Sequence, residues 1–274
     1  MKSFLFGTAA LTTLCLSLPA LAADLPARVT KAPPVLVSPA YDWSGFYVGV
    51  SAGYTFGEDE NISTTGQVAA NIVNVAGGAR PGQVRLEREG FIGGGQAGYN
   101  WQLTPNWVVG LETDISYVDI REDRNVVTIP LNGIGTLNNT FSTRMEYFGT
   151  VRGRIGYAWD RTLVYATGGL AYADIENSVA FFGPSTAGGL LQFTGRNRRT
   201  EAGYTVGAGI EHAFGSNWSV KAEYLYYDFR DETVNVAVIP GNGGGGTGYN
   251  SRFENDGHIV RAGLNYKFGA TSMR

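Results

Sequence analysis

Eight stretches of this chain alternate between apolar residues and polar or small residues, and this alternation constrains the fold more than any other feature. A period of two places successive side chains on opposite faces of a β-strand, so each stretch predicts a strand whose two faces meet different surroundings. The predicted strands cover residues 43–56, 91–103, 107–121, 143–159, 162–175, 201–214, 218–229 and 258–268. Each is as long as the roughly 9 to 11 residues that a tilted strand needs to cross a membrane.

The connections between these strands alternate strictly between long and short. Long segments at 57–90, 122–142, 176–200 and 230–257 contain much Gly, Asn, Ser and Thr, whereas 104–106, 160–161 and 215–217 are very short turns. Eight antiparallel strands that close on themselves leave no edge unpaired, as a sheet in hydrocarbon requires. The sequence therefore predicts an all-β fold, an eight-stranded antiparallel transmembrane β-barrel with long extracellular loops and short periplasmic turns.

The five tryptophans all fall beside the start of the first predicted strand or beside a short turn. Indole rings are favoured where membrane meets water, and transmembrane barrels carry aromatic girdles at those levels. A final aromatic residue ends the last predicted strand. We therefore predict a periplasmic aromatic girdle made of Trp43, Trp101, Trp107, Trp159, Trp218 and Phe268.

The first 22 residues have the features of a secretory signal peptide. Lys2 precedes an apolar stretch at 4–18, and Ala20-Leu21-Ala22 fits a cleavage site. Residues 23–42 contain four prolines and predict a periplasmic linker, 43–268 the barrel, and 269–274 a C-terminal tail. No later stretch is apolar for the roughly 20 residues of a membrane-spanning helix. Cleavage also removes the single cysteine, so we expect no disulfide. The signal predicts export across the inner membrane, and together with the predicted transmembrane barrel it indicates the outer membrane of a Gram-negative cell.

The face predicted to point into the barrel carries an equal number of acids and bases. An eight-stranded barrel is just wide enough for its own side chains to fill, and an unpaired buried charge costs several kcal/mol. The inward acids are Glu112, Asp114, Glu146, Glu201, Glu211 and Glu223, and the inward bases are Arg144, Arg152, Arg154, Lys221, Arg261 and Lys267. From these we predict a lumen charge network of Glu112, Asp114, Glu146, Arg152, Arg154, Glu211, Lys221, Glu223 and Arg261. Such a network would plug the lumen; a narrow porin for small solutes is the alternative.

Catalytic and cofactor motifs occur only in the wrong context. Residues 49–53 read Gly-Val-Ser-Ala-Gly, but a nucleophile elbow needs a strand-to-helix turn, and here the motif lies inside a predicted strand. Residues 93–98 contain the glycine spacing of a dinucleotide site, but no helix follows them. The two histidines, His212 and His258, lie far apart in the sequence, without the ligand spacing of a zinc site. We therefore predict that the protein is not an enzyme and has no cofactor and no metal site. We also predict no nucleic-acid partner, because the net charge is −3 and a nucleic-acid-binding protein is usually basic.

Six runs taken together resemble one family. They are Trp43-Ser-Gly-Phe-Tyr-Val-Gly, Gly93-Gly-Gly-Gln-Ala-Gly-Tyr-Asn-Trp, Leu163-Val-Tyr-Ala-Thr-Gly-Gly-Leu-Ala-Tyr, Val206-Gly-Ala-Gly-Ile-Glu, Trp218-Ser-Val-Lys-Ala-Glu-Tyr-Leu-Tyr-Tyr-Asp and Val260-Arg-Ala-Gly-Leu-Asn-Tyr-Lys-Phe. This pattern is similar to the small outer-membrane barrels of alphaproteobacteria, the outer membrane immunogenic or porin-family proteins. The resemblance covers about residues 43–268 and implies a structural, antigenic surface barrel in contact with outer-membrane lipids and lipopolysaccharide.

The resemblance also implies partners for the two ends of the barrel. The barrel-assembly machinery reads the final aromatic residues of this family, here Tyr266 and Phe268, although six further residues follow Phe268. Some relatives bind haemin or host surfaces, so a loop-mediated adhesin or haemin-binding barrel is a second alternative. The sequence leaves the oligomeric state open.

Overall fold

The computed structural model describes residues 41–57, 60–184, 189–242 and 247–269, all within the compact unit Pro39–Arg274. The predicted signal peptide, nearly all of the predicted linker and residues 270–274 of the predicted tail lie outside the described residues. In chain order the elements are β1 (Gly45–Phe56), β2 (Glu60–Gly66), α1 (Ala69–Ala76), β3 (Gln83–Leu86), β4 (Glu89–Gln102), β5 (Trp107–Thr128), β6 (Leu137–Trp159), β7 (Thr162–Phe182), β8 (Leu191–Ala213), β9 (Trp218–Val238) and β10 (Gly248–Lys267).

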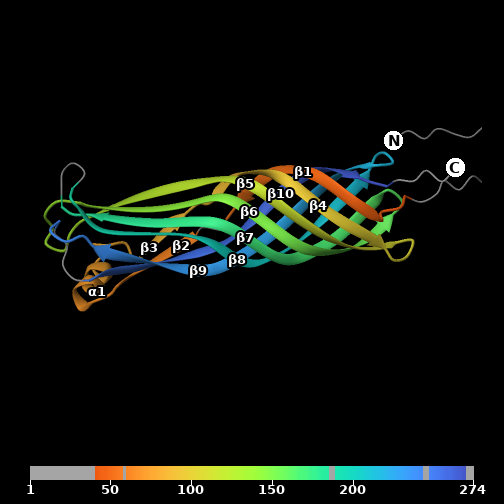
Figure 1. The fold of residues 1–274 in the computed structure, drawn as a ribbon. Coiled ribbons are helices and arrows are strands. Elements are labelled where there is room, and N and C mark those ends of the chain that lie inside the picture. The colour runs from red at the N-terminus through yellow and green to blue at the C-terminus, as the bar shows by residue number, and fades with distance from the viewer. Residues whose placement is uncertain (1–40, 58–59, 185–188, 243–246, 270–274) are drawn as a thin grey trace, which may run out of the picture. The chain divides into compact units, whose positions relative to one another are not determined.

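Eight of these strands form a closed ring (Figure 1). They pair antiparallel in the order β1-β4-β5-β6-β7-β8-β9-β10, and β1 pairs with β10 to close the barrel. At one level of this ring Ala52 lies opposite Gly93 of β4 on one side and Ala262 of β10 on the other. The predicted eight-stranded antiparallel barrel is confirmed. Among the described residues, no helix is long and apolar enough to cross a membrane.

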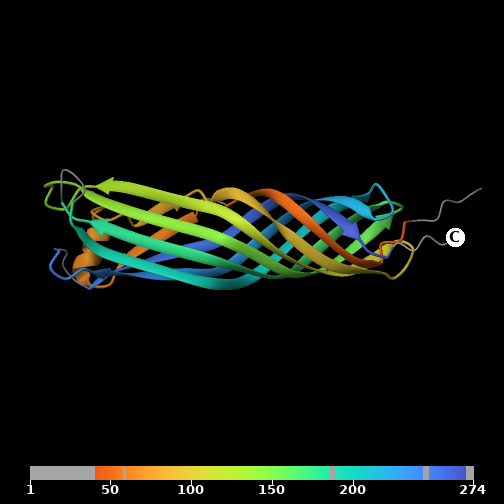
Figure 2. The same cartoon turned by 45° about the horizontal axis from the view of Figure 1, so that its top comes forward.

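The strands are much longer than the alternation predicted. β5 to β9 contain 21 to 23 residues each, and Figure 2 shows them continuing well past the end of β1. At about 3.3 Å per residue and about 45° of tilt, such a strand spans roughly 50 Å along the barrel axis, about twice an apolar membrane band. Most described residues of the segments predicted as loops at 122–142, 176–200 and 230–257 are therefore strand.

The segment at 57–90 also contains regular structure that the sequence did not reveal. It folds as the hairpin β2–β3 with α1 between the two strands. β2 pairs with the first residues of β10, from Tyr249 to Arg252, which extend beyond the part of β10 that pairs with β1. At the end of the barrel that β1 does not reach, β2 therefore takes the place of β1 as the partner of β10.

The outward face changes character about halfway along the long strands. Towards the short turns it carries exposed apolar side chains, which end at a ring of aromatic residues: Phe91, Tyr117, Tyr147, Tyr172 and Tyr204. Beyond this aromatic ring the outward face carries many charged side chains, such as Asp119, Arg121, Arg144, Arg198 and Arg252. Aromatic girdles mark the two membrane interfaces of a transmembrane barrel. We call the part below the ring the membrane half and the part above it the extracellular half.

A β-bulge at this boundary exchanges the two faces of β6. Met145 pairs with Ile175 and Tyr147 pairs with Asp174, so Glu146 is one extra residue on β6. An extra residue shifts the inward phase by one position. Met145 therefore faces the core, while Arg144 is exposed. The prediction that Glu146 and Arg144 point into the lumen was wrong for this reason.

Three buried apolar layers fill the barrel besides its polar interior. The periplasmic layer contains Trp43, Val108, Ala158, Leu163, Tyr165 and Ala213. The layer at the level of the aromatic ring contains Ile92, Val118, Ile120, Met145, Phe148, Ala171, Ala173, Ile175, Leu225, Tyr227, Phe229 and Ile259. The extracellular layer contains Ile62, Val84, Leu86, Phe141, Val179, Phe181, Phe193, Val234, Val236, Tyr249 and Phe253.

Candidate functional site

Eight charged side chains from five strands meet inside the membrane half. They are Glu112 and Asp114 of β5, Arg152 and Arg154 of β6, Glu211 of β8, Lys221 and Glu223 of β9, and Arg261 of β10. Spacings of two residues keep each pair on one face of its strand. None of the eight is more than 5% exposed. Four acids thus face four bases, and we call this set the lumen network.

Strand register brings opposite charges together across the sheet. Glu112 lies opposite Arg152, Lys221 lies opposite Glu211, and Arg261 lies opposite Glu223. Directly opposed side chains on one face of an antiparallel pair have their Cβ atoms about 5 Å apart, which favours opposite charges and disfavours like ones. The pairing of neighbouring strands, together with the alternation along each one, is therefore enough to bring these opposite charges together.

Arg152 lies at the centre of the lumen network. Its Nη2 lies 2.5 Å from Glu112 Oε1 and 3.2 Å from Asp114 Oδ2, while Nη1 lies 3.0 Å from Glu223 Oε1. Its Nε also donates a hydrogen bond of 2.9 Å to Thr150 Oγ1. One guanidinium therefore bridges carboxylates from two strands on different sides of the lumen.

Two further cations complete this central cluster. Arg261 Nη2 lies 2.7 Å from Glu223 Oε2 and 3.0 Å from Asp114 Oδ2. Lys221 Nζ donates to both carboxylate oxygens of Glu112, at 2.8 and 2.9 Å. Each central carboxylate therefore contacts at least two cations, which offsets the cost of removing these charges from water.

Arg154 occupies the periplasmic side of the network. Its Nη1 lies 3.0 Å from Glu211 Oε2, and its Nε donates to Asn100 Oδ1 at 2.8 Å. The guanidinium carbon also lies 4.9 Å from the ring centroid of Tyr47, a cation–π distance. Gly98 makes room for this ring, because a Cβ there would come within 2.3 Å of the Tyr47 hydroxyl oxygen. The lumen is thus packed by polar contacts and by rings at the same level.

The four carboxylates of the lumen network are each only 3% exposed, and each contacts a cation. Below the network, a cavity of about 10 Å³ lies among Trp43, Tyr47, Glu211 and Lys267, about the space of one water molecule. General acid–base chemistry needs a group that reaches a bound substrate. Among the described residues no group of three or more His, Cys, Asp or Glu side chains is placed to hold a metal ion.

The remaining predicted inward charges lie outside the lumen network. Glu146 pairs with Arg198 on the outer surface, at 3.2 Å, and both side chains are well exposed. Glu201 is half-buried higher in β8. Lys267 donates instead to the Asp42 carbonyl at the periplasmic mouth. The network also has neutral partners that the charge pattern does not reveal, such as Asn100 and Thr150, although both point inward on their strands.

Five of the six residues predicted for the periplasmic girdle lie on the outer surface. Trp101, Trp107, Trp159, Trp218 and Phe268 are 43 to 57% exposed. Several contact other rings: Trp107 lies 5.6 Å from Tyr157 and Phe268 lies 5.7 Å from Phe46, measured between ring centroids. These outward rings are therefore placed where a girdle would be, at the end of the barrel with the short turns.

Trp43 differs, and its assignment to the outer girdle was wrong. It is only 2% exposed and packs inside the periplasmic mouth against Leu163 and Tyr165. Gly45 has a φ of +132°, a conformation in which glycine is favoured, so the chain can turn from the mouth into β1. Because the chain enters β1 from inside the barrel, the indole closes the mouth instead of facing lipid.

The chain is similar to several outer-membrane proteins. The family described as "Outer membrane protein beta-barrel domain" matches residues 8–268. The 31 kDa outer-membrane immunogenic protein of Brucella melitensis is 36% identical over 91% of this chain and 93% of that protein. The 22 kDa outer membrane protein of Rhizobium leguminosarum is 28% identical over 85% and 81%. Among solved structures, the outer membrane protein OprG from Pseudomonas aeruginosa has a TM-score of 0.48 at 13% identity, over 82% of this chain and 96% of that one.

Proposed function

Because this chain belongs to the outer membrane protein β-barrel family, we propose that it is a structural, non-enzymatic barrel that holds a rigid platform at the cell surface and keeps its own lumen closed. Its place is the outer membrane, as the named outer-membrane relatives indicate. The observation that carries the proposal is the lumen network, in which four acids and four bases fill the membrane half.

The apolar layers support closure independently of the charges. One layer lies on the periplasmic side of the lumen network and another lies at the level of the aromatic ring. In the upper of these two layers the Phe148 ring lies 5.3 Å from that of Tyr227 and 6.2 Å from that of Phe229. A hydrated path would have to pass both the packed rings and the paired charges. Closure therefore does not depend on one constriction.

The extracellular half supports the role of a platform. Its interior is an apolar core that includes Phe141, Phe181 and Phe253, each fully buried. A core of this kind fixes the strands that carry the outermost turns, so the surface presented to the outside has a defined shape. The Brucella relatives are named as immunogenic, and a rigid exposed surface suits display to antibodies.

The last strand supports the predicted interaction with the barrel-assembly machinery. The Tyr266 ring lies 5.0 Å from Trp218 and 5.1 Å from Phe268, and the Phe268 amide donates to the Phe46 carbonyl at 2.8 Å. Phe268 is 47% exposed and faces outward. The final aromatic residues thus lie at the β1–β10 seam, where a terminal signal would be accessible. The charged surface just above the aromatic ring would face the sugars and phosphates of lipopolysaccharide.

The first experiment is single-channel conductance of the refolded mature protein in a planar bilayer, with folding checked by heat-shifted gel mobility. A closed lumen predicts no current steps in protein that shows the gel shift. The unfolded, heated sample is the control for leaks caused by denatured chains. Steady, ion-selective steps from the folded protein would overturn the closed lumen and make the narrow porin the better function.

A further inference from the structure

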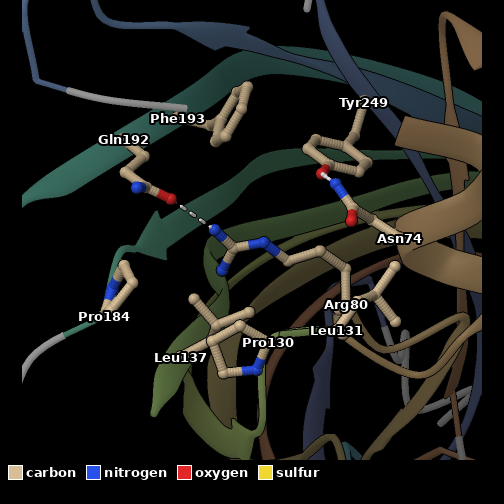
Figure 3. Close-up of a pocket in the computed structure, with 10 residues that line it drawn as sticks. Asn74, Arg80, Pro130, Leu131, Leu137, Pro184, Gln192, Phe193 and Tyr249 are labelled. Carbon is tan, nitrogen blue, oxygen red and sulfur yellow. Dashed lines mark hydrogen bonds between the residues drawn. The ribbon is translucent and has the colours of Figure 1, made fainter. Parts of the chain in front are cut away.

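A buried arginine at the outer mouth of the barrel differs from every cation of the lumen network. Arg80 lies between α1 and β3 and is 3% exposed. Its side chain reaches acceptors on β6, β7 and β8. Figure 3 shows the contact with Gln192 of β8. Each cation of the lumen network has a carboxylate within 3.0 Å, whereas no carboxylate of the described residues lies at ion-pairing distance from Arg80.

The acceptors that Arg80 does contact are all neutral. Nη1 donates to Asn139 Oδ1 at 2.7 Å and to the Phe182 carbonyl at 3.1 Å, and Nη2 donates to Gln192 Oε1 at 2.8 Å. The guanidinium carbon lies 4.9 Å from the centroid of the Phe181 ring. Burial lowers the pKa of Arg80 from its ordinary value, but an arginine remains charged at physiological pH. The mouth therefore holds a positive charge that the described residues do not neutralise.

Arg80 is 3% exposed, and the acceptors of its hydrogen bonds among the described residues carry no charge. A buried charge without a counter-charge is costly in folding. Such a group is retained at lower cost when a ligand supplies the opposite charge.

Arg80 also lines a cavity of about 250 Å³ at this mouth. This volume is about 25 times that of the cavity near Trp43, which has about the space of one water molecule, so it suits a compact organic molecule. Its wall combines the apolar side chains of Leu131, Leu137, Pro184 and Phe193 with the polar groups of Asn74, Arg80, Gln192 and Tyr249 (Figure 3). A concave site that joins apolar walls to a few convergent polar groups is the usual form of a small-molecule site.

We propose that this cavity binds a small organic carboxylate, whose charged group pairs with Arg80 and whose apolar body packs against Phe193, Tyr249 and Leu137. The fork of the guanidinium matches the two oxygens of a carboxylate. Gln192 is half-buried and holds Nη2 through a neutral oxygen, so a carboxylate oxygen can take its place with a charge-assisted bond. The site lies above the closed membrane half, so binding needs no passage through the lumen.

The test is a titration with 4-fluorobenzoate, followed by ¹⁹F NMR line width, on the full mature chain refolded in zwitterionic detergent. Empty micelles correct for partitioning, and 4-fluorobenzyl alcohol serves as the neutral ligand of nearly the same shape. We expect saturable broadening with the carboxylate and at least about tenfold weaker binding of the alcohol, as expected for loss of a charge-assisted hydrogen bond. No saturable binding of the carboxylate up to about 10 mM, or equal binding of the alcohol, would overturn the proposal.

Variants locate the site. Arg80→Gln keeps hydrogen-bonding groups but removes the charge, and we expect about tenfold or greater loss of 4-fluorobenzoate affinity. Leu131→Trp adds bulk at an exposed position of the cavity wall, so it blocks the space while Arg80 stays intact and gives a second measure if Arg80→Gln fails to fold. Arg198→Gln, on the outer surface of β8, is the matched control and should bind like the unmodified protein. Unchanged affinity in folded Arg80→Gln or in Leu131→Trp would contradict this site.

Discussion

The membrane half and the extracellular half are built from the same strands, yet the polarity of their inward and outward faces is reversed. In the membrane half the outward face is apolar, as at Leu111 and Val151, and the inward face carries Glu112 and Arg152. In the extracellular half the outward face is charged, while Phe141 and its neighbours form an apolar interior. Hydrocarbon surrounds the first and water the second, so each half exposes what its surroundings favour and buries the remainder.

The comparison shows that alternation alone identifies a strand but not which of its faces is the inner one. A slip of one residue exchanges the two faces, and the bulge at Glu146 makes such a slip close to the boundary between the halves. The two halves also differ in what holds them together. Paired charges must stay matched one by one, whereas an apolar core depends on volume and shape. Variants in each half test this difference.

The largest effect is expected for Arg152→Ala in the membrane half. The change leaves Glu112, Asp114 and Glu223 with fewer cationic partners in a buried lumen. Removing one partner of a buried ion pair costs about 3 to 5 kcal/mol, so the free energy of unfolding should fall by about that amount. Urea unfolding in lipid vesicles measures it, and bilayer conductance shows whether the lumen opens. Unchanged unfolding together with unchanged conductance would contradict a closing role for the network.

Phe141→Ala tests the other half of the same strand. Phe141 is fully buried and its ring centroid lies 5.8 Å from that of Phe181. Removing a buried phenylalanine side chain costs about 3 kcal/mol or more, but here the loss should stay local. We expect limited proteolysis to cut the extracellular half sooner, while the heat-shifted gel mobility and the silent conductance of the membrane half persist. If the variant lost the gel shift as readily as Arg152→Ala, the two halves would form one cooperative unit.

The same comparison explains how far the sequence could lead. Alternation and turn lengths predicted the closed barrel and the eight charged residues of the lumen network. A spacing of two residues places charges on one face of a strand, whatever the remainder of the chain does. The alternation continues through Val234 and Val236, which are buried in the extracellular core. The polar residues around these two valines have the composition of a loop, which conceals the strand in the sequence. The bulge at Glu146 and the inward turn of Trp43 have no local signal, since each depends on a partner strand.

A smaller, pH-dependent effect is expected from Glu232 in the extracellular half. Its carboxylate is buried and accepts hydrogen bonds from Asn177 and Asn197, without a cation among those contacts. Burial raises the pKa of this carboxyl. The folded state then holds the proton more tightly than the unfolded chain, so this group adds stability below the unfolded pKa and loses it as pH rises through the folded pKa.

Glu232→Gln should therefore remove that dependence. We expect the variant to match the unmodified protein in acid and to resist proteolysis of the extracellular half better at neutral pH, because the amide needs no proton to remain uncharged. Proteolysis rates measured from pH 4 to pH 8 give the comparison. Equal rates for the two proteins throughout this range would mean that the carboxyl is neutral, or well solvated, under all of these conditions.

The smallest effect is expected for Arg198→Ala, the surface counterpart of Arg152→Ala. Arg198 contacts Asp174 at 2.6 Å and Glu146 at 3.2 Å, so in number of charged partners it nearly equals Arg152. The two arginines differ in solvent exposure, because the Arg198 side chain is 51% exposed. Exposed ion pairs contribute little to stability, since water solvates both charges when they separate. We expect urea unfolding to be unchanged within error. A loss approaching that of Arg152→Ala would show that ion pairing itself, and not its burial in the lumen, stabilises this barrel.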